Sequence, residues 1–171
     1  MAEPTALREL DPLLLINLRG DAGAEGFRSA VARVLGVAPP TEPNTVASSG
    51  DVSLLWLGPN EWLATAPAEK HGAVDQLETA LSGQHHSVID VSEGRIALEL
   101  DGGHARAALA QELGLDLRSS SFGSGRCAQT ALARVPVILQ QIDAARFRIF
   151  VRRSFAPYVT DWLRSTIAEL A

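Results

Sequence analysis

The 171-residue chain has a single cysteine, Cys127, and no long uninterrupted run of apolar residues. One cysteine cannot form an internal disulfide, and such scarcity is typical of proteins kept in a reducing compartment. The longest early apolar run, Leu13–Ile16, is far shorter than the ~20 residues that a membrane-spanning helix requires. Residues 1–11 also lack the basic and apolar regions of a secretory signal. We therefore expect a cytoplasmic protein that does not enter a membrane.

The chain also lacks an excess of positive charge. Its formal net charge is −5 at pH 7, whereas sequence-independent binding to nucleic acid needs a basic surface that displaces counterions from phosphates. Hydrophobic residues make up 46% of the chain, which is enough for a substantial core. The composition therefore argues against disorder of the whole chain and against nucleic acid as a partner.

The motifs that would indicate a cofactor or a metal are missing. Gly123-Ser124-Gly125 is not followed by the Lys-Ser/Thr pair of a phosphate-binding loop, and no Gly-x-Gly-x-x-Gly follows an expected strand. Four scattered histidines and one cysteine provide no spaced ligand pairs for a closed zinc site. His85 and His86 are adjacent on an expected strand, so their side chains point to opposite faces. We predict no catalytic, cofactor-binding or metal-binding residues.

Three reactive side chains allow two interpretations each. Cys127 follows Arg126, which could activate a thiol, but no histidine lies nearby in the sequence to act as a base, so a structural thiol is favoured. Asp90 and Asp101 end expected strands, where active-site acids often lie. Ser92 and Gly94 follow Asp90, and Gly102 follows Asp101, and in such turns an aspartate accepts hydrogen bonds from the local backbone, which we favour here.

Hydrophobic periodicity predicts an α+β protein in which helices pack on antiparallel sheets. We treat residues 1–171 as a single unit with two related subdomains, residues 1–92 and 93–171. In the strand at 95–100, Ile96, Leu98 and Leu100 are expected to be buried, and Glu99 is expected to face water. The expected strands span residues 13–18, 54–57, 61–67, 87–91, 95–100, 127–133, 135–140 and 146–152. The expected helices span 27–35, 73–81, 105–113 and 155–170, and 38–51 and 118–126 are expected loops.

Two of the three tryptophans lie on an expected β-hairpin at residues 54–67. Gly58, Pro59 and Asn60 suit a tight turn between its strands. Alternation along each strand groups Trp56 with Leu54 and separates Trp62 from Leu63. We therefore expect Trp56 to anchor the core and Trp62 to lie on the other face, where it can meet a partner.

The chain has one basic cluster, and it lies on the strand expected at 146–152. Arg146, Arg148 and Arg152 alternate with apolar residues and share a face with Phe150. Such a face is commonly just solvated, but arginine beside an aromatic ring is also favoured at protein interfaces. Together with Trp62, these four residues form our predicted partner interface.

Several segments in order along the chain resemble the gamma subunit of heterotetrameric sarcosine oxidase. The resemblance lies in Trp56–Leu63, the turn Asp90–Arg95, the run Arg126–Leu139, the strand Phe147–Ala156 and the helix around Trp162. It covers about residues 50–170, and the register of these motifs along the chain makes it specific. It implies a fold related to the folate-binding aminomethyltransferase of the glycine cleavage system.

The resemblance implies a non-catalytic scaffold subunit whose partners are the alpha, beta and delta subunits. That complex oxidatively demethylates sarcosine to glycine and yields hydrogen peroxide and a one-carbon unit. FAD, FMN, NAD, tetrahydrofolate and zinc belong to the other subunits. Aminomethyltransferases hold folate with an acidic residue near the position of Leu139–Phe147, where this chain offers only Asp143. Two alternatives remain: a folate-binding one-carbon transferase that uses Asp90 or Asp101, and an accessory module of another amine-oxidising complex.

Overall fold

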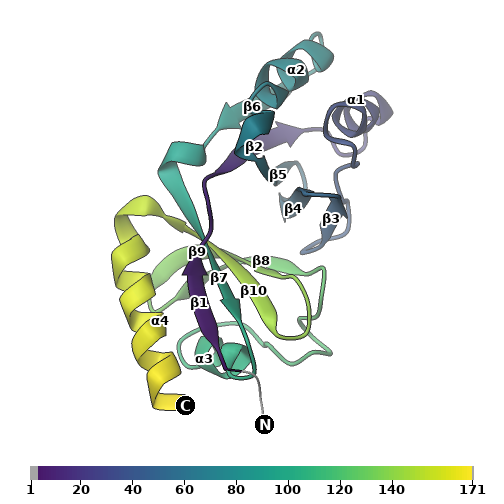
Figure 1. The fold of residues 1–171 in the computed structure, drawn as a ribbon. Helices are drawn as coiled ribbons and strands as arrows, with labels where there is room; N and C mark the ends of the chain where they lie inside the picture. Colours follow the sequence, from purple (N-terminus) through teal and green to yellow (C-terminus); the bar gives the residue numbers. More distant parts are fainter. Residues whose placement is uncertain (1–3, 171) are drawn as a thin grey trace. The chain divides into compact units, whose positions relative to one another are not determined.

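The computed structural model describes residues 4–170 and divides the chain into two units (Figure 1). The first unit is Pro12–Glu93, and the second combines Met1–Asp11 with Gly94–Ala171. Each contains a five-stranded antiparallel sheet and two α-helices among its described residues. The observed division lies one residue from the expected one at 92/93, but the start of the chain belongs to the second unit. No helix in residues 4–170 is both long and apolar enough to cross a membrane.

The sheet of the first unit has the strand order β3-β4-β5-β2-β6. Its two helices cover one face, where Phe27, Val31 and Leu77 pack with Leu18 in a continuous core. The first helix ends at Gly36, which has a φ of 76° and donates its N–H to the carbonyl of Ala32, as expected for a helix C-terminal glycine. The elements are β2 (Leu13–Gly20), α1 (Glu25–Leu35), β3 (Val46–Ser49), β4 (Val52–Gly58), β5 (Glu61–Pro67), α2 (Ala73–Ala80) and β6 (His86–Asp90).

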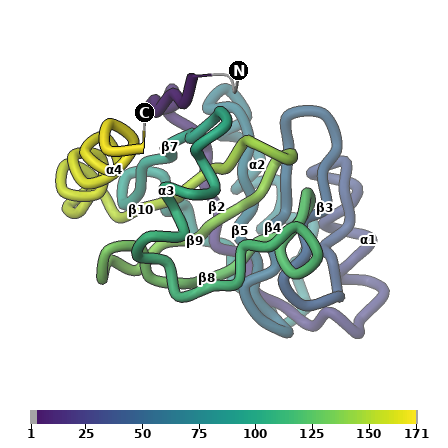
Figure 2. Tube along the Cα trace, turned by 90° about the horizontal axis from the view of Figure 1, so that it is seen from below, coloured from purple at the N-terminus to yellow at the C-terminus, as the bar shows by residue number. Residues whose placement is uncertain are grey.

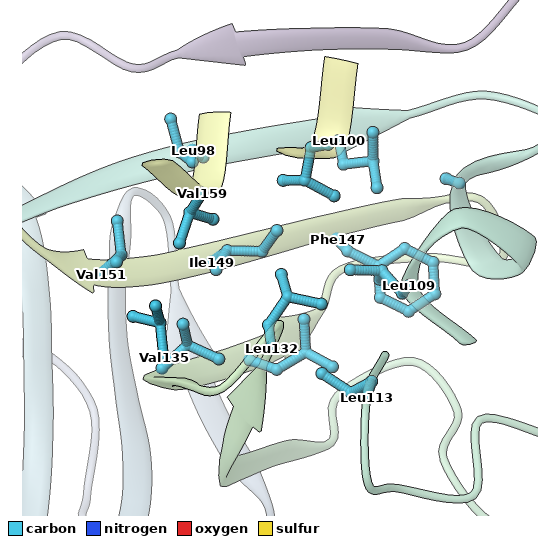
Figure 3. Close-up of a cluster of buried hydrophobic side chains, with 14 of the residues drawn as sticks. Leu98, Leu100, Leu109, Leu113, Leu132, Val135, Phe147, Ile149, Val151 and Val159 are labelled. Atoms are coloured by element: carbon cyan, nitrogen blue, oxygen red, sulfur yellow. The ribbon is translucent and has the colours of Figure 1, made fainter. Parts of the chain in front are cut away.

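The sheet of the second unit has the strand order β1-β7-β10-β9-β8. Leu98, Leu100 and Ile149 point from its strands toward Leu109 and Val159 of its two helices (Figure 3). The expected burial of Ile96, Leu98 and Leu100 is confirmed. The elements are β1 (Ala6–Glu9), β7 (Arg95–Asp101), α3 (Ala105–Ala110), β8 (Cys127–Leu132), β9 (Val135–Gln141), β10 (Arg146–Arg152) and α4 (Ala156–Leu170).

The two units repeat one topology. The first runs β2-α1-β3-β4-β5-α2-β6, and the second runs β7-α3-β8-β9-β10-α4. Both paths can be followed along the Cα trace in Figure 2. In each sheet the three consecutive strands lie beside the first strand of the unit, in the orders β3-β4-β5-β2 and β8-β9-β10-β7. The position of β6 is taken in the second sheet by β1, from the start of the chain. The two subdomains are therefore related by the same order of elements. They differ in the last strand, which is β6 at the end of the first unit and β1 from the start of the chain in the second.

Two strands were not expected from the sequence. Residues 46–49 form β3 within a segment predicted to be a loop, where it pairs with β4 at the edge of the sheet. Residues 6–9 form β1, which pairs with β7 at positions 89 to 95 residues later in the chain. Both are four residues long, and such short segments give little periodic signal. Their strand structure depends on a partner that local sequence does not reveal.

Pro136 lies in an interior strand, although proline is normally confined to edges and bends. The β8–β9 turn is formed by Ala133 and Arg134, whose φ values are 48° and 69°, so β9 begins directly after a tight turn, as expected. In the ladder with β8, Pro136 is adjacent to the hairpin end and opposite Ala131. Strand β10 pairs with β9 only from Val137 onward. The missing N–H of Pro136 therefore costs the sheet no ladder hydrogen bond.

Candidate functional site

No group of three or more His, Cys, Asp or Glu side chains in residues 4–170 is placed to hold a metal ion. His86 Nδ1 lies 2.9 Å from the carbonyl oxygen of Gln84, and its Nε2 lies 3.0 Å from Glu78 Oε2. The Gln84 carbonyl and then Glu78 raise the pKa of His86, because both stabilise the protonated ring. His85 is exposed. These contacts are those of a structural histidine tied to α2.

The reactive side chains weighed from the sequence have structural surroundings. Cys127 is fully buried and forms no disulfide. Asp90 Oδ1 accepts the N–H of Ser92 at 2.9 Å, which is the predicted turn role. Asp143 Oδ1 accepts the N–H groups of Ala145 and Arg146, each at 3.0 Å, and so holds the β9–β10 turn. These oxygens are occupied by the local backbone rather than directed at a shared site.

The most unusual polar arrangement is a row of side chains that crosses all five strands of the second sheet. It lies on the face opposite the core shown in Figure 3, at successive paired positions. In strand order the row is Arg8, Glu99, Arg148, Gln140 and Cys127. Arg8 Nη2 donates to Glu99 Oε1, and Arg148 Nη2 lies 3.3 Å from Glu99 Oε2. One carboxylate thus bridges two guanidinium groups on neighbouring strands.

The prediction that Glu99 faces water is wrong, because its side chain is only 3% exposed. A carboxylate is rarely buried unless it is paired, and here arginines on both neighbouring strands provide the pairing. Burial acts to raise the pKa of Glu99, but the hydrogen bonds from Arg8 and Arg148 outweigh burial, and the net effect lowers the pKa. Glu99 is therefore ionised and serves as the central charge of the row.

A second pair on the same sheet face has like charges. Arg95 and Arg152 lie directly opposite each other on β7 and β10. Burial, and then the positive charge of Arg152, lower the pKa of Arg95. Neither side chain forms an ion pair with another residue of the described chain. Like charges directly opposite on adjacent strands are destabilising, so this end of the sheet presents two guanidinium groups without a counterion.

Alternation in the sequence places Arg95 and Glu99 together on the face of their strand opposite the core, but it does not indicate that they lie beside the arginines of β10. The expected sharing of a face by Arg146, Arg148, Phe150 and Arg152 agrees with the observed alternation, in which Phe147, Ile149 and Val151 enter the core. Which residues of β7 oppose them follows only from the register of β7 against β10. That register is set by tertiary pairing, and no local sequence signal specifies it.

The arginines predicted at the partner interface differ in their surroundings. Arg152 is exposed, whereas Arg148 is held by Glu99. Arg146 Nε lies 3.3 Å from Asp101 Oδ2 and 3.5 Å from Asp143 Oδ2, so it is paired within the chain. Asp101, at the end of β7, thus forms an ion pair with Arg146. Contact of these arginines with a partner stays a prediction, and Arg152 is the one whose charge is uncompensated.

The expected orientation is wrong for Trp62, whereas Trp56 faces the core as expected. Trp56 and Trp62 are directly opposite each other in the β4–β5 ladder, so both rings lie on the core face. Trp62 is fully buried, packs 5.6 Å from the ring of Phe27 between centroids, and donates its Nε1–H to the carbonyl of Pro40 at 2.8 Å. Trp56 is only half-buried. Phe150, like Trp62, is fully buried, so neither ring offers side-chain surface for a partner.

Comparison with known proteins gives a consistent result. A model of the "sarcosine oxidase, gamma subunit" family matches residues 19–169 of the chain. The sarcosine oxidase subunit gamma of an Arthrobacter species is 34% identical over 171 residues, which cover 99% of this chain and 83% of that protein. The match includes the first 50 residues, which carried little of the sequence resemblance.

Two solved structures support the same relationship at the level of the fold. A chain of the heterotetrameric sarcosine oxidase from Corynebacterium sp. U-96, in complex with pyrrole 2-carboxylate, is 32% identical with a TM-score of 0.90. That match covers 96% of this chain and 84% of the other. The glycine cleavage system aminomethyltransferase T from Bartonella henselae is 16% identical with a TM-score of 0.67, covering 94% of this chain and 45% of the enzyme. The predicted α+β fold of aminomethyltransferase type is thereby confirmed.

Proposed function

Since the chain belongs to the sarcosine oxidase gamma subunit family, we propose that it is a scaffold subunit of a heterotetrameric sarcosine oxidase and has no catalytic residues of its own. The observation that carries the proposal is the likeness, over 96% of the chain at a TM-score of 0.90, to a chain of such an oxidase. A match of this extent spans most of both units rather than one shared motif.

In this proposal the partners are the alpha, beta and delta subunits. The assembled complex oxidises sarcosine to glycine with release of hydrogen peroxide and a one-carbon unit. FAD, FMN, NAD, tetrahydrofolate and zinc act on those other subunits. The role of this chain is to hold its partners in the geometry that their chemistry needs.

The surroundings of its polar side chains support a structural role. Asp90 and Asp143 accept hydrogen bonds from turns, and the Cys127 thiol is fully buried. Glu99 is bridged between arginines, so it has no free oxygen edge for substrate. The uncompensated charge at Arg152 is instead suited to a carboxylate on a partner, because a guanidinium binds a carboxylate through two parallel hydrogen bonds.

The test is reconstitution with and without this chain. Affinity-tagged chain is co-expressed with the other three subunits, and sarcosine-dependent peroxide formation is measured for the complex, for the three subunits alone and for the isolated chain. We expect activity from the full complex, none from the isolated chain, and incomplete assembly when it is omitted. Peroxide formation by the isolated chain would contradict the proposal, as would unchanged assembly without it.

Tetrahydrofolate binding is measured separately on the isolated chain by titration calorimetry. The proposal predicts no heat of binding at micromolar concentrations. Measurable affinity would support the folate-binding one-carbon transferase instead. An Asp90→Asn variant then tests whether that affinity depends on the carboxylate that the alternative requires.

A further inference from the structure

The second unit exposes an aromatic surface along α4. Phe155 and Tyr158 are 40% and 52% exposed, and they are two of the three large hydrophobic side chains that the described chain exposes. Trp162 follows one helical turn after Tyr158 and is half-buried against the core. Phe155 lies in the 3-10 turn directly before α4, and spacings of three and four residues place its ring and those of Tyr158 and Trp162 on one side of this segment. Exposed apolar patches mark protein interaction surfaces, and aromatic residues are enriched at interfaces relative to the rest of the protein surface.

This aromatic surface continues into a cavity between the end of α3 and α4, with a volume of about 260 Å³. We call this cavity the acidic groove, because Glu112 and Glu169 contribute carboxylates to it and no arginine or lysine is among its described lining residues. Neither glutamate forms an ion pair within residues 4–170. The full lining is Gln111, Glu112, Trp162, Ser165, Thr166 and Glu169.

The topological repeat provides an internal comparison for the acidic groove. The corresponding helices of the first unit, α1 and α2, also border a cavity, an open one of about 610 Å³. That cavity is lined by both Arg33 and Asp75, and it has no aromatic residue among its described lining. The fold therefore requires neither an aromatic ring nor two unpaired carboxylates at this place. Those features belong to the sequence of the second unit alone.

We infer that the acidic groove receives a basic side chain, an arginine above all, from a partner subunit. A guanidinium between Glu112 and Glu169 would bind a carboxylate through two hydrogen bonds, and it would stack on the Trp162 ring. Phe155 and Tyr158 would then contact apolar residues flanking that arginine. The inference rests on the proposed function, because the partner is another subunit of the complex.

Charge selects a different chain as the occupant rather than a second copy. The chain carries a net charge of −5, and a symmetric dimer through this surface would bring two acidic grooves close together. Repulsion between like charges at an interface disfavours such a pairing. An anionic membrane surface is disfavoured for the same reason. A basic patch on a partner protein is the complement that remains.

The experiment compares the wild-type chain with a variant in which the two carboxylates of the acidic groove are neutralised, and it measures how each binds the other subunits. Glu112→Gln and Glu169→Gln are combined in one variant, because glutamine keeps the size and removes the charge. The matched control combines Asp75→Asn, in the corresponding cavity of the first unit, with Glu69→Gln, so that the net charge changes equally. Binding of the purified chain to the remaining subunits is measured by surface plasmon resonance at low and high salt, and thermal melting checks that each variant folds.

We expect the acidic-groove variant to bind roughly tenfold more weakly than wild type, as the loss of charge-assisted hydrogen bonds predicts. Its affinity should also depend less on salt, since fewer charges are screened. The control should bind like wild type. Equal binding by all three proteins would overturn the inference and leave the proposed function standing. Failure of the wild-type chain to bind any subunit would overturn the proposed function itself, and the inference with it.

A photo-crosslinking residue at Ser165, which lines the acidic groove, identifies the occupant directly. Mass spectrometry of the crosslinked complex should find a peptide of a partner subunit that contains arginine or lysine. A crosslink between two copies of this chain, or one to a peptide without a basic residue, would contradict the inference.

Discussion

Replacing Glu99 by glutamine should lower the free energy of unfolding by about 2 kcal/mol, because the substitution weakens the charge-assisted hydrogen bonds from Arg8 and Arg148. Breaking a fully buried ion pair costs about 3–5 kcal/mol, because it leaves an unpaired charge in a dry interior. Glu99 is 3% exposed, but Arg8 is 67% exposed and Arg148 is 23% exposed. Both arginines can recover hydration once the carboxylate is gone, so the cost is below that of a fully buried pair.

Urea unfolding of the isolated chain at pH 7, followed by circular dichroism, measures this loss. The midpoint should fall while the denaturant slope stays unchanged, which indicates a change in stability rather than in the unfolded state. The control is Arg8→Gln, which removes the more exposed partner and should lower the free energy of unfolding by less than Glu99→Gln does, because solvent screens an exposed ion pair. A Glu99→Gln variant within about 0.5 kcal/mol of wild type would refute the argument that this carboxylate anchors the polar row.

Comparison of the wild-type chain with Glu99→Gln at different pH values gives a second test. The pKa of Glu99 is lowered in the folded chain, so its contribution is present above the unfolded value of about 4.3 and is lost as pH falls through the folded pKa. The stability difference between wild type and Glu99→Gln should thus be constant from pH 6 to 8 and shrink under acid conditions. A difference that grows on acidification would have the wrong sign for an ionised, paired carboxylate.

Three further outcomes are expected from the first unit and from the arginine pair. Trp62→Phe should destabilise the chain by about 1–3 kcal/mol in urea, because it removes a buried hydrogen bond and part of a buried ring. The pKa of His86 is raised in the folded chain, so its contribution to the free energy of unfolding should be present below pH about 6.5 and be lost as pH rises through the folded pKa. The melting temperatures of wild type and His86→Gln should therefore converge toward pH 8. Arg152→Gln should stabilise the isolated chain by about 0.3 kcal/mol, since it relieves repulsion with Arg95, yet weaken binding to the other subunits; a loss of stability in the isolated chain would contradict this.

Patterns within single segments predicted most of the elements. Helix α4, the strand β7 and the tryptophan hairpin all came from alternation or helical spacing that a single segment carries. Phe155 and Tyr158 also fit the predicted apolar stripe of α4, yet both are exposed. Periodicity specifies which residues share a face, but it does not specify how far the neighbouring elements extend over that face.

Pairing between distant strands could not be predicted in the same way. The segment Ala6–Glu9 has one residue, Leu7, that packs against the core, so its pattern alone does not identify a strand. The burial of Glu99 depends on that strand, because Arg8 is one of its two partners. The error in placing Glu99 in water and the failure to predict β1 thus have one cause.

The tryptophan hairpin illustrates how a missing register changes a functional prediction. Alternation correctly grouped Trp56 with Leu54 and Trp62 with Ala64. The orientation of one strand relative to the other was the missing information, and the observed pairing of Trp56 with Trp62 puts both rings on the core face. A residue expected at an interface is therefore an anchor of the first unit.

The two units show where function can diverge while a topology is kept. Residues that pack the sheets are apolar in both units, because burial constrains them. The pockets beside the helices are free of that constraint, and they differ: one is lined by Arg33 and Asp75, and the other by Trp162 and two carboxylates. Among its described residues, the second unit has carboxylates without an ion pair beside α4 and two facing arginines, Arg95 and Arg152. A partner chain that provides the counterions for these charges would be selected by electrostatic complementarity.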